Sequence, residues 1–261
     1  MTTPTLIPLT HLGLLKVSGV DAGSFLQGQL SSDIRALTPV SHQLAAFCNR
    51  LGRALALMDI FSLQEQEYFL ILPLDILQDI QQQLQKYIVF SKAKIEDMSE
   101  DYSGIALLNT PSAGSEALFS FRSTPDAPIQ LWGKKTQIAD FISTHPCPIG
   151  TLNEFILAQM RAHIPLIAKA QTGHFLPHPL GLVKLGVINF KKGCFVGQEI
   201  IARMQYRTEV KKQLQYFEMQ QAQDLMPQEK IERDGTHGTV VNALQIHDGF
   251  YAVLAIMDQT A

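Results

Sequence analysis

Short runs of apolar and β-branched residues predict strands along most of the chain. In the first half the predicted strands cover residues 14–17, 45–47, 55–61, 68–72, 88–90 and 104–108. In the second half they cover residues 129–132, 214–219, 239–244 and 250–256. The turn-forming pairs Asp234-Gly235 and Asp248-Gly249 separate the last three runs, so a small all-β region is expected at the end of the chain.

Apolar residues at helical spacing predict helices between these strands. The first stripe follows Asp21 in a capping position, and the second ends near Lys86. Thr151 and Glu154 have the spacing of a capping box, which predicts a helix from there to His163. A further helix is predicted over 135–143. Strands and helices therefore alternate irregularly, and at 261 residues the chain is expected to form an α+β fold with more than one compact unit.

The composition is that of an ordinary globular protein, with 46% hydrophobic and 17% charged residues. The first sixteen residues lack an early basic group and a long apolar run, so they do not resemble a signal peptide. No window holds the roughly 20 apolar residues that a membrane helix needs. These features predict a cytoplasmic protein without a membrane segment.

The cysteines, Cys48, Cys147 and Cys194, are odd in number and widely spaced. No C-x-x-C pair is present, which argues against a disulfide framework and against a zinc site made by this chain alone. A cysteine that matters for function is therefore expected to act singly.

Positive charge is concentrated in one segment. The formal net charge is −3, yet residues 184–212 hold seven basic and two acidic residues, Glu199 and Glu209, for a net charge of +5. Such a local field suits an anionic ligand, for example a polyglutamate tail, a phosphate or an RNA backbone. A solvated basic surface is the simpler interpretation.

The cysteine loop, residues 189–199, combines features that point to a ligand and to a reactive thiol. Gly193 and Gly197 allow positive φ and a close approach to the backbone, and a helix that begins at 197–199 would attract anions. Neighbouring Lys191 and Lys192 would stabilise the thiolate of Cys194. The alternative is a small buried cysteine with a packing role. Candidate binding residues in and after the loop are Lys191, Lys192, Gly193, Gly197, Gln198, Glu199 and Arg203.

Within this loop, Lys192-Gly193-Cys194-Phe195-x-Gly197-Gln198-Glu199 resembles the K-G-C-[FY]-x-G-Q-E signature of the YgfZ family, relatives of the glycine-cleavage T-protein. The resemblance extends to residues 14–21, 25–29 and 33, to residues 47–48 with 52–53, and to residues 86–87 with 89–90. It implies a T-protein-like fold: two ferredoxin-like α+β units around a central opening, with a small C-terminal β-barrel. The expected domains are 1–45 with 147–205, then 46–146, and a short barrel over 206–261.

The resemblance also implies tetrahydrofolate or a related folate as cofactor, and a role in supporting iron-sulfur enzymes such as those that thiolate tRNA. Phe155 stands where an aromatic residue can pack on the folate ring, although a place in the helix core would explain it equally. Arg161 stands where relatives have a glutamate that accepts the N–H groups of the pterin. A guanidinium only donates hydrogen bonds, so folate recognition is expected either to be weakened or to use another acceptor.

Three functions remain open from the sequence. The first is a folate-binding accessory protein with Cys194 as the reactive residue. The second is a folate-dependent aminomethyltransferase, against which the missing carboxylate at Arg161 counts. The third is an RNA-binding module that uses the basic segment, where only Tyr206 lies among the later basic residues as an aromatic that could stack on bases.

Overall fold

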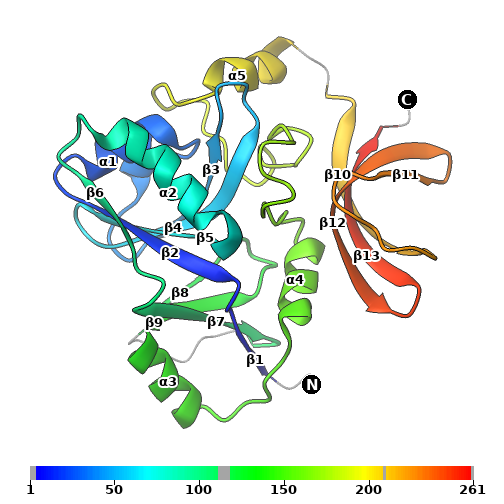
Figure 1. Cartoon of the computed structure of the whole chain (residues 1–261), viewed down its shortest axis with the longest axis horizontal. Coiled ribbons are helices and arrows are strands. Elements are labelled where there is room, and N and C mark those ends of the chain that lie inside the picture. Colours follow the sequence, from blue (N-terminus) through cyan, green and yellow to red (C-terminus); the bar gives the residue numbers. More distant parts are fainter. Residues whose placement is uncertain (1–3, 111–117, 208–209, 260–261) are drawn as a thin grey trace.

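Two antiparallel sheets, packed face to face, form the larger part of the protein (Figure 1). The structure is a computed structural model that describes residues 4–110, 118–207 and 210–259. The first sheet has the order β3 (His42–Cys48), β4 (Ala54–Gln64), β5 (Glu67–Pro73), β2 (Leu12–Ser18) and β6 (Lys94–Asp97). The second has the order β1 (Thr5–Pro8), β7 (Tyr102–Leu108), β9 (Ile129–Lys134) and β8 (Phe119–Arg122).

Helices cover the outer faces of both sheets. On the five-stranded sheet lie α1 (Ala22–Gln29) and α2 (Leu74–Ile88), whose apolar stripes share a buried core with β2, β4 and β5. On the other sheet lies α3 (Lys135–Thr144), packed on β7 and β9. A third core, which includes Phe61, Phe69 and Trp132, fills the space between the sheets. The result is a fold of four layers, in the order helix, sheet, sheet and helix. The sequence of β4 is a long apolar run because both faces of this strand are covered.

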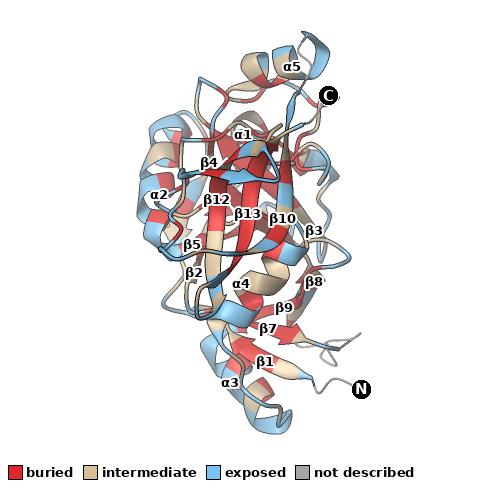
Figure 2. Ribbon diagram, turned by 90° about the vertical axis from the view of Figure 1, so that its right-hand side faces the viewer, coloured by how far each residue is buried: buried red, intermediate tan, exposed pale blue. Residues whose placement is uncertain are grey.

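The C-terminal region is a curled, open sheet that forms a half-barrel (Figure 1). Its order is β10 (Lys212–Gln220), β13 (Phe250–Asp258), β12 (Thr236–His247) and β11 (Lys230–Arg233). Two register shifts in β12, at Val240/Asn242 and Gln245/His247, bend the sheet. Its buried residues continue into a core with α4 (Leu152–Arg161) and the long segment 162–197, as the red interior of β12 and β13 shows in Figure 2.

Most predicted elements are confirmed, and the fold is α+β as expected. The predicted strand at 88–90 is wrong, because α2 continues to Ile88 and the next two side chains, Val89 and Phe90, are 73% and 97% exposed. The helix after Thr151 has its capping box but ends at Arg161, since His163 adopts a φ of 57°. None of the helices in the described ranges is long and apolar enough to span a membrane.

The sheets do not follow the expected domain limits. Strand β2, from the predicted first segment, pairs with β5 and β6 of the second, and β3 pairs with β4 across the expected boundary. Residues from both segments thus share the same cores. The boundaries at 45 and 146 remain a prediction.

Candidate functional site

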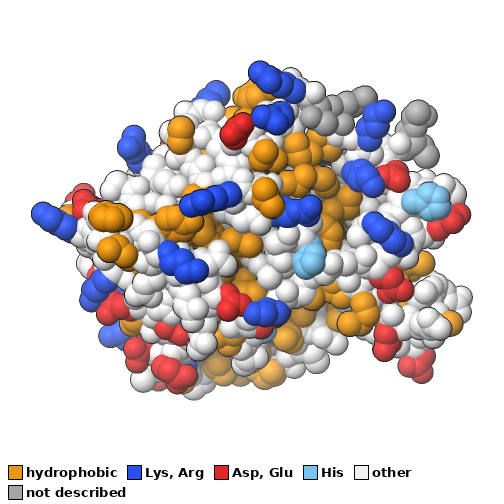
Figure 3. Space-filling model, turned by 45° about the horizontal axis from the view of Figure 1, so that its top comes forward, with side chains coloured by type: hydrophobic (Ala, Val, Ile, Leu, Met, Phe, Trp, Pro, Cys, Tyr) orange, Lys and Arg blue, Asp and Glu red, His pale blue; other side chains and the backbone are white. Residues whose placement is uncertain are grey.

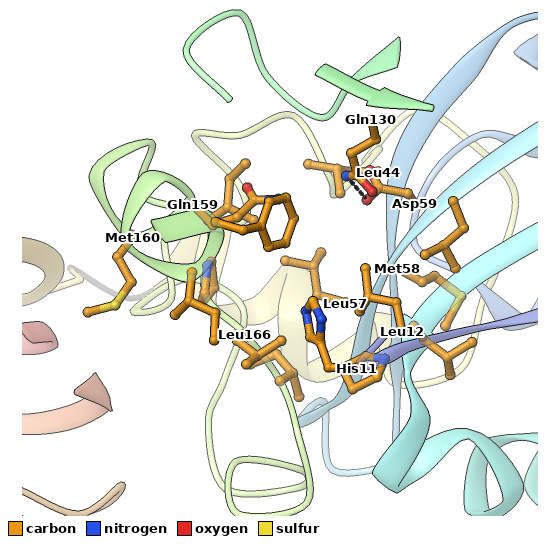
Figure 4. A pocket seen from close by; sticks show the side chains of 18 residues that line it. His11, Leu12, Leu44, Leu57, Met58, Asp59, Gln130, Gln159, Met160 and Leu166 are labelled. Atoms are coloured by element: carbon orange, nitrogen blue, oxygen red, sulfur yellow. Dashed lines mark hydrogen bonds between the residues drawn. The ribbon is translucent and has the colours of Figure 1, made fainter. Parts of the chain in front are cut away.

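A mostly apolar cavity lies where the two packed sheets meet α4 and the segment that follows it. Its empty space is about 580 Å³, part of it open to solvent. In Figure 4, Gln159 reaches into this space from α4, and Leu57 and Asp59 reach into it from β4 on the opposite side. We call this space the central cavity. Its walls are largely leucine, isoleucine, methionine and phenylalanine side chains, so the few polar groups in it stand out.

Asp59 brings a carboxylate into this apolar wall. The residue is 9% exposed, and its side chain lies between two partners. Oδ1 is 2.7 Å from His42 Nε2. Oδ2 accepts a hydrogen bond of 3.2 Å from Gln130 Nε2, which Figure 4 shows as a dashed line. Two carboxylate oxygens can accept about four hydrogen bonds, so Asp59 keeps acceptor capacity toward the cavity.

His11 enters the cavity from the start of β2 as a neutral imidazole. Burial lowers the pKa of His11 to about 4, and the nearby charge of Asp75 opposes this only in part. Its Nδ1 is buried without a hydrogen-bond partner among the described residues. The ring meets Phe155 edge to face, with centroids 5.6 Å apart.

Gln159 and Phe155 face the cavity from α4. Gln159 Oε1 is a second buried atom for which the described part of the chain offers no partner. Phe155 is 3% exposed and belongs both to the cavity wall and to the core between the sheets. A buried amide oxygen without a partner costs free energy, so its position facing a cavity is consistent with a bound donor.

Arg161 lies away from this cavity. Its guanidinium is exposed and donates to Tyr216 Oη at 3.3 Å and to Glu218 Oε1 at 3.2 Å, which joins α4 to β10. The position at which the family resemblance implies a glutamate therefore links α4 to the C-terminal sheet. Acceptors within the cavity come from Asp59 and Gln159 instead.

The cysteine loop forms a different surface. Gly197 has a φ of 82°, and a Cβ there would stand 2.5 Å from the carbonyl oxygen of Asn49, so only glycine fits. The next residue begins α5 (Gln198–Arg207), as predicted. Cys194 is exposed and lines a groove with Arg50 and Tyr87. This groove and the central cavity have no lining residue in common.

Lys192 anchors the loop to the protein. The residue is 9% exposed, and its Nζ donates to the carbonyl oxygens of Gln27, Leu30 and Ser32 at 2.6 to 2.7 Å. Burial lowers the pKa of the Lys192 ammonium to about 8. An ammonium has three donors and all three are used, so Lys192 has none left for an anion, and its place in the structure is that of a tether.

The other predicted binding residues of this region lie near or at the surface. Lys191 and Gly193 are exposed, and Arg203 forms an exposed ion pair with Glu199 at 3.0 Å. Gly197, Gln198 and Glu199 line the groove beside Cys194. Their roles in binding remain predictions. Glu209, which the charge of the basic segment includes, lies outside the described residues.

The three thiols have different surroundings. Cys48 is buried, and burial raises the pKa of its thiol to about 12. Cys147 is half-buried and Cys194 is exposed. Within the described ranges, no three His, Cys, Asp or Glu side chains gather where they could hold a metal ion.

Four polar residues of the cavity were not predicted as site residues from the sequence: His11, Asp59, Gln130 and Gln159. Asp59 could have been predicted, since a carboxylate within the apolar run of residues 55–61 must find hydrogen-bond partners when the strand is buried. The other three have no local pattern, and only the fold brings them together.

Comparisons with known proteins agree with this architecture. No protein-family model matches the chain. An uncharacterised protein of Haemophilus influenzae is 28% identical over 258 residues, which cover 97% of this chain and 88% of that protein. The tRNA-modifying protein YgfZ of Klebsiella pneumoniae is 28% identical, with 97% of this chain and 85% of the relative covered.

Among solved structures, the glycine cleavage system aminomethyltransferase T from Bartonella henselae aligns with a TM-score of 0.73. The alignment covers 98% of this chain and 78% of that one, at 14% identity, and therefore speaks for the fold alone. The chain is thus similar to YgfZ along nearly its whole length and has the fold of aminomethyltransferase T, which confirms its resemblance to the YgfZ family.

Proposed function

We propose that this chain is a folate-binding accessory protein of tRNA modification that supports iron-sulfur enzymes. One observation carries the folate part: an apolar cavity with an aromatic wall holds a carboxylate and two buried polar atoms without partners among the described residues. A reduced pterin needs an apolar slot for its ring and acceptors for its adjacent N–H groups. The similarity to a tRNA-modifying relative supports the second part.

The chemistry of the residues that line the cavity suits a pterin. Asp59 and Gln159 would accept hydrogen bonds from its N–H donors, in place of the glutamate that Arg161 replaces. Phe155 would pack on the ring, and the neutral His11 could either donate to or accept from it. His42 and Gln130 hold the Asp59 carboxylate in place. Bound folate would supply one-carbon chemistry or act as a signal of folate supply.

Cys194 would act on the outer surface, away from the folate. An exposed thiol in a groove is accessible to a partner protein, and a thiolate is a soft ligand for iron and a nucleophile for sulfur. One cysteine cannot form a closed metal site, so any iron would be shared with a partner enzyme.

A second function is favoured by Asp59. The missing carboxylate at Arg161 counted against an aminomethyltransferase, and the cavity does contain a carboxylate. Asp59, oriented by His42, could serve as the acid or base of such a transfer. A transferase would lose turnover in an Asp59→Asn variant and keep it in a Cys194→Ser variant.

Calorimetry with tetrahydrofolate tests the folate proposal. Phe155→Leu should weaken binding by about 1 kcal/mol, roughly fivefold in Kd, because a leucine side chain cannot stack on the pterin ring. Alanine is unsuitable here, since truncating a buried phenylalanine costs about 3 to 5 kcal/mol in stability. Phe141→Leu on α3, also buried but outside the cavity, is the matched control and should bind as wild type. No heat of binding at millimolar tetrahydrofolate would contradict the proposal.

Complementation tests the role of the thiol. In a strain that lacks the native protein, Cys194→Ser should fail to restore tRNA thiolation, whereas Cys147→Ser should restore it. Because Cys194 is exposed, serine should leave the melting temperature near wild type. Full complementation by a stable Cys194→Ser variant would exclude the thiol from the function.

A further inference from the structure

The turn between β3 and β4 contributes an arginine to the groove that holds Cys194 and another to a second groove, and basic side chains line both. The groove beside Cys194 contains Arg50. The second groove, between the β3–β4 turn and the C-terminal sheet, is lined by Arg53, His174, Lys212 and Lys230 among others. We call these five basic residues the basic track.

The turn between β3 and β4 links the two parts of the track, because Arg50 lines one groove and Arg53 the other. Asn49 holds it closed, because its backbone N–H donates to the Arg53 carbonyl oxygen at 2.9 Å and its Oδ1 accepts from the N–H groups of Leu51 and Arg53. Gly52 packs on Ile200 of α5. Arg50 and Arg53 are three residues apart, so their Cα atoms lie at most about 11 Å from each other. One ordered turn therefore carries a cation into each groove.

Little negative charge opposes the track. Glu199 is the only acidic residue that lines either groove in the described part of the chain, and it is paired with Arg203. Lys212 has an ion pair with Asp258 at 2.9 Å, whereas Lys230 donates to the Thr239 hydroxyl. Figure 3, which brings the α5 end forward, shows Lys and Arg spread over this face and most Asp and Glu along its lower margin.

Exposed aromatic side chains accompany the cations. Tyr87 lines the Cys194 groove and is 39% exposed, and Phe90, just after the end of α2, is 97% exposed. Tyr206 on α5 is 72% exposed. The sequence placed only Tyr206 near the basic segment, whereas the fold brings α2 to the same face. Cations beside exposed rings are the combination that binds single-stranded nucleic acid, through phosphates and stacked bases.

We propose that the basic track and the Cys194 groove bind a single-stranded segment of RNA. An acidic peptide would use the cations and leave the rings without a role, which favours a nucleic acid. The choice of RNA over DNA rests on the proposed link to tRNA modification, but the binding surface does not depend on folate. RNA in the track would end beside Cys194, on the face that a partner enzyme would approach.

Fluorescence anisotropy with a labelled 12-nucleotide single-stranded RNA tests the proposal on the full chain. Arg50→Glu with Lys230→Glu, one exposed substitution in each groove, should weaken binding at least tenfold. The slope of log K against log salt should also become shallower, by about 0.7 for each phosphate that the variant no longer neutralises. Lys94→Glu with Lys135→Glu, the same charge change on β6 and α3 outside both grooves, should leave affinity within twofold. Tyr87→Ala should weaken binding about tenfold.

Several results would overturn the proposal. They are equal affinity of the track variant and wild type, equal loss in the Lys94/Lys135 control, or competition by polyglutamate as strong as by RNA. Calorimetry with tetrahydrofolate on the track variant separates this failure from failure of the folate proposal. Folate binding should be unchanged there, because neither substituted residue lines the central cavity.

Discussion

The central cavity and the cysteine loop differ in how the sequence specifies them. The loop is contiguous and lies at the surface except for Lys192 and Phe195, and it holds two glycines and two lysines, so its pattern can be read directly from residues 189–199. The cavity is buried and apolar, and its polar groups come from four separate parts of the chain. The loop can therefore be recognised in the sequence as a motif, whereas the cavity forms only when the two sheets pack together.

Lys192 gives the sharpest contrast within the loop itself. Lys192→Met should destabilise the protein by about 3 to 5 kcal/mol, because three backbone carbonyl groups lose their donor in a buried place. The adjacent Lys191→Met should change stability by less than about 0.5 kcal/mol, since Lys191 is exposed. Urea unfolding of both variants measures this difference. Small and equal losses would show that Lys192 belongs to the surface and is no tether.

The pH dependence of stability that His11 causes tests whether water is excluded from the apolar cavity. Below its ordinary pKa of 6.5 the imidazole of the unfolded chain binds a proton, whereas the folded protein resists protonation until about pH 4. Stability should therefore fall by about 3 kcal/mol as the pH drops from 6.5 to 4, in addition to the contributions of other groups.

In His11→Gln this part of the acid dependence should disappear, which chemical denaturation at a series of pH values can measure. His237→Gln, at an exposed position, is the control and should keep the wild-type profile. An unchanged profile in His11→Gln would mean that water reaches the imidazole.

The three cysteines should differ in their rates of alkylation, and this difference in free energy is smaller than the two effects on stability. With iodoacetamide, Cys194 should react about tenfold faster than the half-buried Cys147, a difference of about 1.4 kcal/mol in activation free energy. Cys48 should be the slowest, because it is buried and its thiol has a raised pKa. Mass spectrometry after brief labelling ranks the three. Labelling of Cys194 at or below the rate of Cys147 would contradict a reactive thiol at Cys194.

Local physical chemistry made most of the fold predictable. The capping box at Thr151, the apolar stripe of α2 and the hairpin turns of the C-terminal sheet are short-range signals, and the structure contains all three. Val89 and Phe90 were misleading because their apolar side chains suggested a buried strand, and the structure leaves both exposed. Whether an apolar side chain is exposed depends on which elements pack against it, and the spacing of apolar residues in the sequence does not reveal this.

The candidate site was predictable only in part. The loop glycines and the start of α5 follow from backbone geometry, and Cys194 is exposed as a reactive thiol must be. The direction of the Lys192 side chain could not be inferred, because its three carbonyl partners lie 160 or more residues earlier in the chain. For the same reason the place of the Asp59 carboxylate in the cavity wall could not be inferred without the fold.

The most direct test of the account compares tetrahydrofolate binding by wild type, Asp59→Asn and Cys194→Ser in one calorimetric series. The central claim is that folate binding and thiol chemistry use separate sites. Asp59→Asn replaces one carboxylate acceptor with a donor and should weaken binding by about 1.5 to 3 kcal/mol, while alkylation of its Cys194 stays at the wild-type rate. Cys194→Ser should bind folate as wild type does. Loss of folate binding in Cys194→Ser, with wild-type binding in Asp59→Asn, would contradict the account.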